Sequence, residues 1–182
     1  RAQWGVMSEQ HAEFSALAAQ VAAEVGHVLA RVRAEEVEQL VEAIIRTRRL
    51  FLAGRGRSGA MMNAFAIRLT HLDIHCHVVG ESTTPSLQYG DVLIVGSGSG
   101  ETITAVLTAR SAQENGGMLA VITSRPESTL GAMADLTVVI PAPVREATTL
   151  ETEATIQPMG SLFEQTLLLL LDTIVLMLKD RL

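Results

Sequence analysis

Apolar residues in the first third of the chain recur at steps of three and four positions. Two such stretches, over residues 14–32 and 37–45, have polar residues between the apolar ones. This period is typical of a helix with one apolar face, so the sequence predicts two amphipathic helices. Arginines close the second stretch, where positive charge suits the carboxyl end of a helix.

From residue 50 the pattern changes to short, continuous apolar runs that alternate with helix-like stretches. Strands that are apolar on both faces, with helices between them, indicate a parallel sheet covered by helices on both sides. The predicted strands are 50–53, 74–79, 92–95, 118–123 and 136–140. The predicted helices are 58–72, 102–114, 128–133 and 159–180, and a long polar loop is predicted over 141–157.

These elements predict an α/β fold: a three-layer α-β-α sandwich with a five-stranded parallel sheet and N-terminal helices. We expect one domain over residues 1–182, with a helical segment at 1–49 and an α/β core at 50–182. In such sheets, ligands bind at the carboxyl ends of the strands.

The last apolar run, over residues 162–178, raises the question of a membrane span. Glu164, Gln165 and Asp172 interrupt it, whereas a span needs about 20 apolar residues with few charges. The sequence therefore predicts a buried helix, at the core or at a subunit interface, and no membrane partner. The chain begins with Arg1, and Met7 is a candidate natural start that would leave residues 1–6 as added sequence.

Composition narrows the function classes. The net charge is −6 and aromatic residues make up 3% of the chain. Nucleic-acid surfaces need clustered Lys and Arg and stacking platforms, so we expect no nucleic-acid partner. The single cysteine, Cys76, has no partner for an internal disulfide, and no signal peptide is visible. Both observations favour a cytoplasmic protein.

The turn G-R-G-R-S-G, residues 54–59, joins the first predicted strand to its helix. It matches the G-x-G-x-x-G dinucleotide fingerprint in the right strand–turn–helix context. The acidic residue expected at the end of the second strand is poorly placed, because Glu81 comes late and Asp73 precedes that strand. A nucleotide ligand therefore stays open at this turn.

A second turn, S-G-S-G-E-T at residues 97–102, follows the third predicted strand. Small residues let the backbone close around an anion, and the helix start that follows favours negative charge. The turn lacks the G-K-[ST] ending of a nucleotide P-loop, so we expect a phosphomonoester rather than a triphosphate. The predicted substrate-binding residues are Ser58, Ser97, Gly98, Ser99, Gly100, Glu101 and Thr102, with extra charge from Arg55 and Arg57.

The alternative is that both turns are ordinary helix starts, since Ser, Thr and Gly are common at helix N-caps. Two such turns after neighbouring strands would nevertheless face one crevice. Glu101 is most simply an acidic residue in the first turn of its helix.

These residues resemble the sugar isomerase (SIS) domain family and, within it, the 6-phospho-3-hexuloisomerases. The second turn is similar to the family's phosphate-binding serine/threonine loop. The more specific match lies in the combination of motifs, which are G-R-G-R-S-G (54–59), R-L-x-H-L (68–72), V-V-G-E (78–81), S-G-S-G-E-T (97–102) and P-x-G-S-x-F-E (158–164). The family's short basic tail with a histidine has no counterpart before Leu182, so no role is carried over from it.

The resemblance implies an isomerase that interconverts D-arabino-hex-3-ulose 6-phosphate and D-fructose 6-phosphate through a cis-enediol, the second step of formaldehyde fixation by the ribulose monophosphate pathway. It also implies no metal and no organic cofactor, and a homo-oligomer (tetramer or dimer) with shared sites. The alternatives are a non-catalytic SIS module that binds a sugar phosphate and regulates a partner, and a nucleotide-dependent enzyme.

Moving a carbonyl between neighbouring carbons requires a base, and one carboxylate can carry out both proton transfers. Glu164, beside Leu162 and Phe163, is the candidate base, and the resemblance points to the same position. The alternative is a capping box, in which Ser161 caps the last helix and Glu164 reaches back to it.

The histidines carry weaker predictions. His71, in the R-L-x-H-L motif, is a candidate for assisting ring opening or enediol protonation across a subunit boundary. A cation at a helix C-terminus explains it equally well. His75 and His77 alternate on a strand, but two ligands are too few for a metal site.

Overall fold

The computed structural model describes residues 2–143 and 155–182, with side chains from residue 11 onward. It contains the predicted elements in the predicted order. They are α1 (Ala2–Leu29), α2 (Ala34–Arg46), β1 (Leu50–Gly54), α3 (Gly56–His71), β2 (Cys76–Val78), β3 (Val92–Gly96), α4 (Ile103–Glu114), β4 (Met118–Thr123), α5 (Thr129–Met133), β5 (Leu136–Val139) and α6 (Ser161–Lys179). The second strand is shorter than the predicted 74–79. Most of the polar loop predicted over 141–157 lies outside the described residues.

The five strands form one parallel sheet in the order β2-β1-β3-β4-β5. After β2 the chain crosses back over β1, and β3 pairs with the other side of β1. The switch in direction therefore lies between β1 and β3, where Gly54 pairs with Gly96 at their carboxyl ends. This is the edge where ligands bind in doubly wound sheets.

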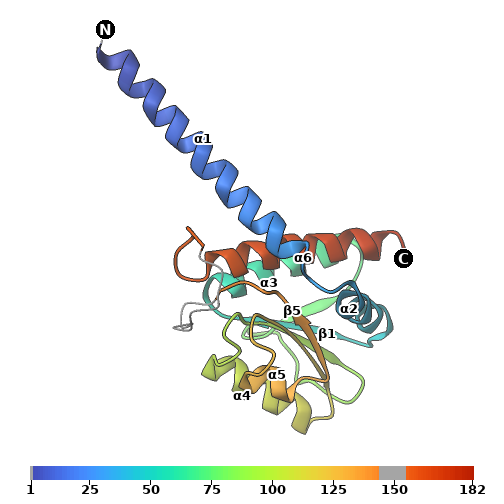
Figure 1. Cartoon of the computed structure of the whole chain (residues 1–182). Helices are drawn as coiled ribbons and strands as arrows, with labels where there is room; N and C mark the ends of the chain where they lie inside the picture. Colours follow the sequence, from blue (N-terminus) through green and yellow to red (C-terminus); the bar gives the residue numbers. More distant parts are fainter. Residues whose placement is uncertain (1, 144–154) are drawn as a thin grey trace.

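Alternation along each strand divides the core into two layers. Leu50 and Leu52 of β1 point to one face, where α2, α3 and α6 cover the sheet. Phe51 and Ala53 point to the other face, which α4 and α5 cover (Figure 1). All four side chains are buried, because both faces of a central parallel strand lie under helices. The predicted three-layer α/β fold is confirmed.

The apolar helix α6 is mostly a core element. Its buried residues, among them Leu167, Leu171 and Ile174, belong to the larger of the two core clusters. Among the described residues it is the one helix with the length and composition of a membrane span, and half of that stretch is buried inside the molecule. Packing against α3, α1 and α2 therefore accounts for much of its apolar character.

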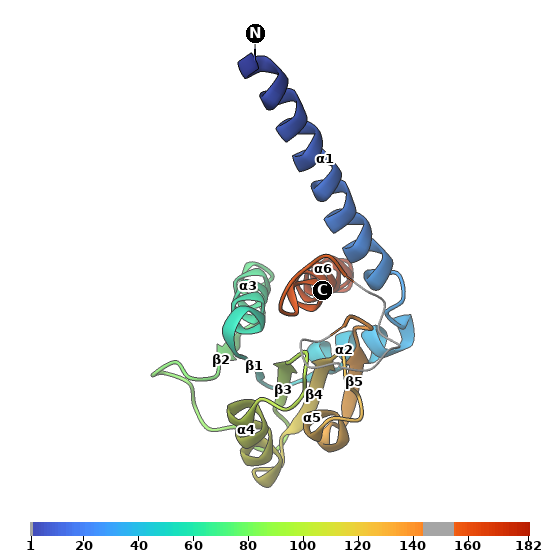
Figure 2. The ribbon, with the colours of Figure 1, turned by 60° about the vertical axis from the view of Figure 1, so that its left-hand side comes forward.

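Helix α1 behaves differently, because most of its length projects away from the rest of the chain (Figures 1 and 2). Near its end, Val25 and Val28 are buried against the core. Farther out, Phe14 is 72% exposed and Leu17 is 49% exposed. The apolar positions predicted from the helical period are thus covered only at the carboxyl end of α1 within one chain.

Candidate active site

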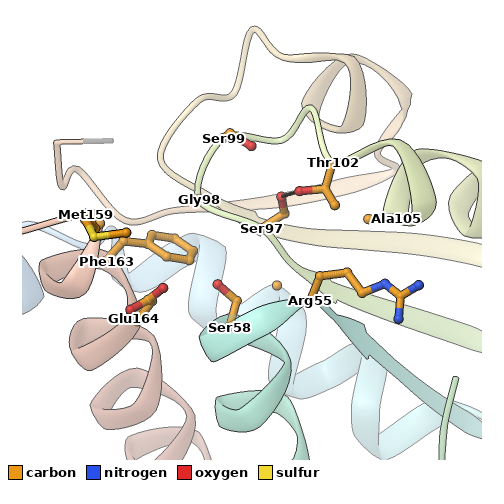
Figure 3. Close-up of a pocket in the computed structure, with 12 residues that line it drawn as sticks. Arg55, Ser58, Ser97, Gly98, Ser99, Thr102, Ala105, Met159, Phe163 and Glu164 are labelled. Carbon is orange, nitrogen blue, oxygen red and sulfur yellow. Dashed lines mark hydrogen bonds between the residues drawn. The ribbon is translucent and has the colours of Figure 1, made fainter. Parts of the chain in front are cut away.

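A cavity of about 190 Å³ lies at the switch point between β1 and β3. The turn after β1, the loop after β3 and the start of α6 meet around it (Figure 3). The predicted crevice between the two glycine-rich turns is therefore present, and Glu164 opens onto the same cavity. It is lined by Arg55, Ser58, Gly96, Ser97, Gly98, Ser99, Thr102, Ala105, Met159, Gly160, Phe163 and Glu164.

The loop after β3 turns its carbonyl groups toward β4 and α5. The Gly98 carbonyl accepts hydrogen bonds from Ser124 N (3.1 Å) and Thr123 Oγ1 (3.2 Å), and the Gly100 carbonyl accepts one from Leu130 N (3.0 Å). Among the described residues, no acceptor is found for the N–H groups of Gly98 and Ser99. The loop therefore has two N–H groups left for a ligand while its Gly98 and Gly100 carbonyls are occupied, which suits an anion.

Close packing explains why this loop needs glycine. A side chain at Gly98 would lie 3.1 Å from the ring of Phe163, which forms the opposite wall of the cavity. At Gly100 the backbone has φ of +66°, and an added Cβ would lie 1.9 Å from Ser128 Oγ. Gly100 is therefore required for this shape, whereas a side chain at Gly98 would have to push the Phe163 ring aside.

Hydroxyl groups complete the anion site. Ser97 Oγ accepts a hydrogen bond from Gly100 N (3.2 Å) and lies 3.5 Å from Thr102 Oγ1. Thr102 is the N-cap residue of α4, yet its side chain makes no capping hydrogen bond. Ser58 on α3 lines the cavity from the other side (Figure 3). The hydroxyls of Ser58 and Thr102 are therefore available to a bound phosphate.

The turn after β1 owes two of its glycines to close approach. A Cβ at Gly54 would lie 2.9 Å from Gly59 Cα, so the strand end and the helix start touch there. Arg55 donates from Nε to Thr104 Oγ1 on α4 (2.9 Å), which draws its guanidinium away from Glu164 (Figure 3). Packing thus explains these glycines of the G-x-G-x-x-G match without a nucleotide.

Glu164 faces the cavity from the first turn of α6, and its side chain is 15% exposed. Arg57 Nε lies 2.9 Å from Glu164 Oε2, at ion-pair distance. That oxygen is buried and, among the described residues, receives no hydrogen bond of good geometry. Burial raises the pKa of Glu164, and the charge of Arg57 opposes this only in part. A carboxylate with a raised pKa is suited to taking and returning a proton near neutral pH.

The capping-box alternative for Glu164 is wrong. The N-cap residue of α6 is Gly160, with φ of +82°, and no side chain caps this helix end. Ser161 is already helical, and its Oγ accepts a hydrogen bond from Arg57 Nη1 (2.9 Å). Glu164 therefore lies one position too far along the helix to close the box.

Four of the predicted residues lie outside the cavity lining: Arg57, Gly100, Glu101 and His71. Gly100 and Glu101 shape the loop, and the Glu101 carboxylate accepts hydrogen bonds from Thr129 N and Oγ1 (2.8 Å each). Those bonds lower the pKa of Glu101, which marks it as a structural tie to α5. His71 is exposed at the far end of α3, 13 residues or about 20 Å from Ser58. Its catalytic role stays a prediction that requires a neighbouring subunit.

Sequence reasoning did not select Met159, Gly160 or Phe163, although all three line the cavity. They lie within the P-x-G-S-x-F-E motif, so all residues of that motif could have been taken as candidates for the cavity lining. Met159 has φ of +58°, an unusual backbone conformation for a residue with a long side chain. Among the described residues, no three His, Cys, Asp or Glu side chains gather as a metal site would require.

Comparisons with known proteins agree on one family. The model of the SIS domain matches residues 43–172. The 3-hexulose-6-phosphate isomerase of Bacillus subtilis is 43% identical over 90% of this chain and 88% of its own length. That of Mycobacterium gastri is 39% identical over 86% of this chain and 78% of its own. A Methanococcus jannaschii protein, whose crystal structure was taken to imply the same function, superposes with a TM-score of 0.74 at 30% identity, over 89% of this chain and 88% of that one.

Proposed function

Because this chain belongs to the SIS domain family, we propose that it is a phosphosugar isomerase that interconverts D-arabino-hex-3-ulose 6-phosphate and D-fructose 6-phosphate. The observation that carries the proposal is the meeting of an anion loop and a buried carboxylate at one cavity. Relatives that are 43% and 39% identical over most of the chain are named for this reaction. The proposed place in metabolism is the ribulose monophosphate pathway.

The phosphate of the substrate binds in the loop after β3. The unpaired N–H groups of Gly98 and Ser99 and the hydroxyls of Ser97, Ser99 and Thr102 are its donors. Ser58 adds a hydroxyl from α3. A phosphate carries about −1.5 to −2 charges near neutral pH, so it gains both from these donors and from the start of α4. Binding at the loop leaves the sugar carbons to extend toward Phe163 and Glu164.

Glu164 is the base for both proton transfers. From the 3-ketose it takes the proton on C2, the C3 carbonyl oxygen becomes a hydroxyl, and a cis-enediol forms. Returning a proton to C3 while the C2 hydroxyl loses its own creates the C2 carbonyl of fructose 6-phosphate. The reaction moves no net electrons out of the sugar, so the residues need to supply only acid–base chemistry and charge stabilisation.

Hydrogen exchange tests the activity directly. Fructose 6-phosphate is incubated with the protein in deuterated water, and the hydrogen on C3 is followed by NMR, beside a coupled assay that starts from the hexulose 6-phosphate. We expect turnover and incorporation of deuterium at C3 without added cofactor. Binding of fructose 6-phosphate with neither turnover nor exchange would identify a regulatory module and overturn the proposal.

We further propose that the protein is a cytoplasmic homo-oligomer, a dimer or tetramer, in which second copies cover α1. The exposed apolar residues Phe14 and Leu17 lie on a helix that most of the chain does not touch. Leu169 and Leu176 on α6 are exposed as well. Apolar patches of this kind mark contacts between proteins.

Light scattering of a Phe14→Glu/Leu17→Glu variant checks this assembly. We expect the variant to lower the particle mass while circular dichroism stays unchanged, because charges on both residues oppose burial of the helix face. A double substitution at two exposed polar positions of the same helix, Gln20→Glu and Glu13→Gln, is the control. An unchanged mass for the apolar variant would exclude α1 as the contact.

A further inference from the structure

We propose that Arg57 is a positioning residue, which joins the Glu164 carboxylate to the start of α6 and so fixes where the base lies over the substrate. The inference rests on the proposed function, since it takes Glu164 as the base. The G-R-G-R-S-G turn contains two arginines, and the structure gives them different contacts. Arg57 is the one that reaches the site of chemistry.

The contacts of Arg57 bridge two helices that are far apart in sequence. From the first turn of α3, its Nε lies 2.9 Å from Glu164 Oε2. Its Nη1 donates to Ser161 Oγ at 2.9 Å, and Ser161 is buried. The guanidinium is planar, so anchoring one nitrogen on Ser161 restricts where the others point. Arg57 thus holds the carboxylate against α6 with Ser161 as the fixed point.

Arg57 also supplies the nearest charge to the base. Among the described residues, Arg57 is the one charged group at ion-pair distance from Glu164. The loop after β3 brings only hydroxyls and amides to the cavity, and the Arg55 guanidinium is directed to Thr104. On α6 itself the next ionisable residue is Asp172, two turns further along.

Burial raises the pKa of Glu164 and Arg57 lowers it. Without Arg57 the carboxylate would hold its proton up to a higher pH, and only the ionised form can act as a base. Arg57 therefore favours the ionised form of the base as well as orienting it. The side chain of Arg57 is 60% exposed, so we expect this effect to be moderated by solvent.

The experiment compares Arg57→Gln, Arg57→Lys and Ser161→Ala with Arg68→Gln, which removes one positive charge from the exposed far end of the same helix. Each variant is measured for kcat and KM across pH. For Arg57→Gln we expect kcat to fall about 10- to 100-fold through loss of alignment. We expect the acid limb of its kcat/KM profile to move to higher pH, because the charge that lowers the pKa of Glu164 is gone.

Arg57→Lys keeps the charge but not the two-pronged contact, so its acid limb should stay near that of the unmodified protein while kcat remains low. Ser161→Ala should lower kcat less than Arg57→Gln and leave KM nearly unchanged. Arg68→Gln should match the unmodified protein in kcat and in the acid limb of the kcat/KM profile. If Arg57→Gln keeps the kcat and the acid limb of the unmodified protein, the proposal is wrong.

A second readout does not depend on activity. The side-chain carboxyl carbon of Glu164 can be followed by NMR in protein labelled with 13C-glutamate, and assigned by its absence in Glu164→Gln. The titration midpoint should rise in Arg57→Gln and not in Arg68→Gln, and equal midpoints would overturn the proposal. An unmodified protein without isomerase activity would instead defeat the proposed function, which keeps the two failures distinct.

Discussion

Two carboxylates of this chain, the buried Asp91 and the partly buried Glu164, each lie beside one arginine, at opposite ends of the same strand. Asp91 directly precedes β3, and its side chain is fully buried. Both of its oxygens accept hydrogen bonds from Arg49, at 3.0 Å and 2.5 Å, and Gln88 N donates another at 2.7 Å. Glu164 lies near the carboxyl end of β3, and one of its oxygens is buried without a hydrogen bond.

The different hydrogen bonding gives the two carboxylates opposite pKa shifts. Burial raises the pKa of Asp91, but the hydrogen bonds from Arg49 and Gln88 outweigh it and the net pKa is lowered. Burial raises the pKa of Glu164, and its single arginine does not outweigh it. A fully paired carboxylate is a structural element that stays ionised. A partly paired one can exchange a proton, and functional sites are where such groups occur.

Glu164→Gln should have the largest effect. It keeps the size of the side chain but removes the base, so we expect kcat to fall by about 10²- to 10⁴-fold. The melting temperature should stay equal or rise, because an amide is cheaper to bury than a poorly paired charge. Kinetics and calorimetry of the same preparation check both. A lowered melting temperature with retained activity would assign Glu164 to structure.

Asp91→Asn should show the reverse pattern. The change leaves Arg49 without its charged partner, and we expect the free energy of unfolding to fall by about 2 kcal/mol. The anion loop lies at the other end of β3, so kcat and KM should stay nearly unchanged. Denaturant unfolding and the coupled assay measure the two effects. Loss of activity in a stable Asp91→Asn protein would contradict the view that Asp91 serves stability at one end of β3 while the reaction takes place at the other end.

Thr102→Val tests whether a helix-start hydroxyl binds phosphate or caps its helix. Thr102 makes no capping hydrogen bond, whereas Ser128 Oγ at the start of α5 accepts one from Gly131 N (3.3 Å). We expect Thr102→Val to raise KM about tenfold through loss of one phosphate donor, with little change in stability. Ser128→Ala is the matched control and should cost about 1 kcal/mol of stability with KM unchanged. Equal effects on KM would remove Thr102 from the anion site.

The smallest effect is a difference in how stability depends on pH. Asp91 has a lowered folded pKa, so its contribution is present above the unfolded value of about 3.9 and is lost as the pH falls through the folded value. Glu164 has a raised folded pKa, so the folded state gains stability as the pH falls from above that value toward the unfolded value of about 4.3. The melting-temperature difference from the unmodified protein should therefore be negative for Asp91→Asn and positive for Glu164→Gln at pH 7. Both differences should shrink toward pH 3, and scanning calorimetry across pH measures them.

Much of the site could be predicted from the sequence because it lies in local motifs. Each glycine-rich turn follows a strand and begins a helix, and parallel strands bring such turns to one edge. The two turns therefore indicate that residues 97–102 and Ser58 meet at one crevice, and the resemblance to the SIS family adds Glu164 to them. The motifs do not indicate the contact of Arg57 with Glu164, because it joins α3 and α6 across about a hundred positions of chain.

The sequence also did not fix the first residue of α6, or whether the same chain or a second copy covers α1 and approaches His71. Ser161 and Glu164 have the spacing of a capping box, but the left-handed Gly160 starts α6 one residue earlier. The periodic apolar residues of α1 correctly predicted a helix, yet periodicity does not say whether the same chain or another one covers the face. His71 poses the same question, since α3 places it at the far end from the cavity.

By itself, the sequence determined the order of helices and strands, the parallel sheet and the two glycine-rich turns that meet at its edge. These features follow from the hydrophobic period, from the short apolar strands and from the glycine-rich turns, and each of these patterns involves only a few neighbouring residues. The tertiary structure alone decided which charge lies beside which carboxylate. Asp91 and Glu164 are chemically alike as residues, and the donors that the fold brings to each lower the pKa of Asp91 and leave that of Glu164 raised.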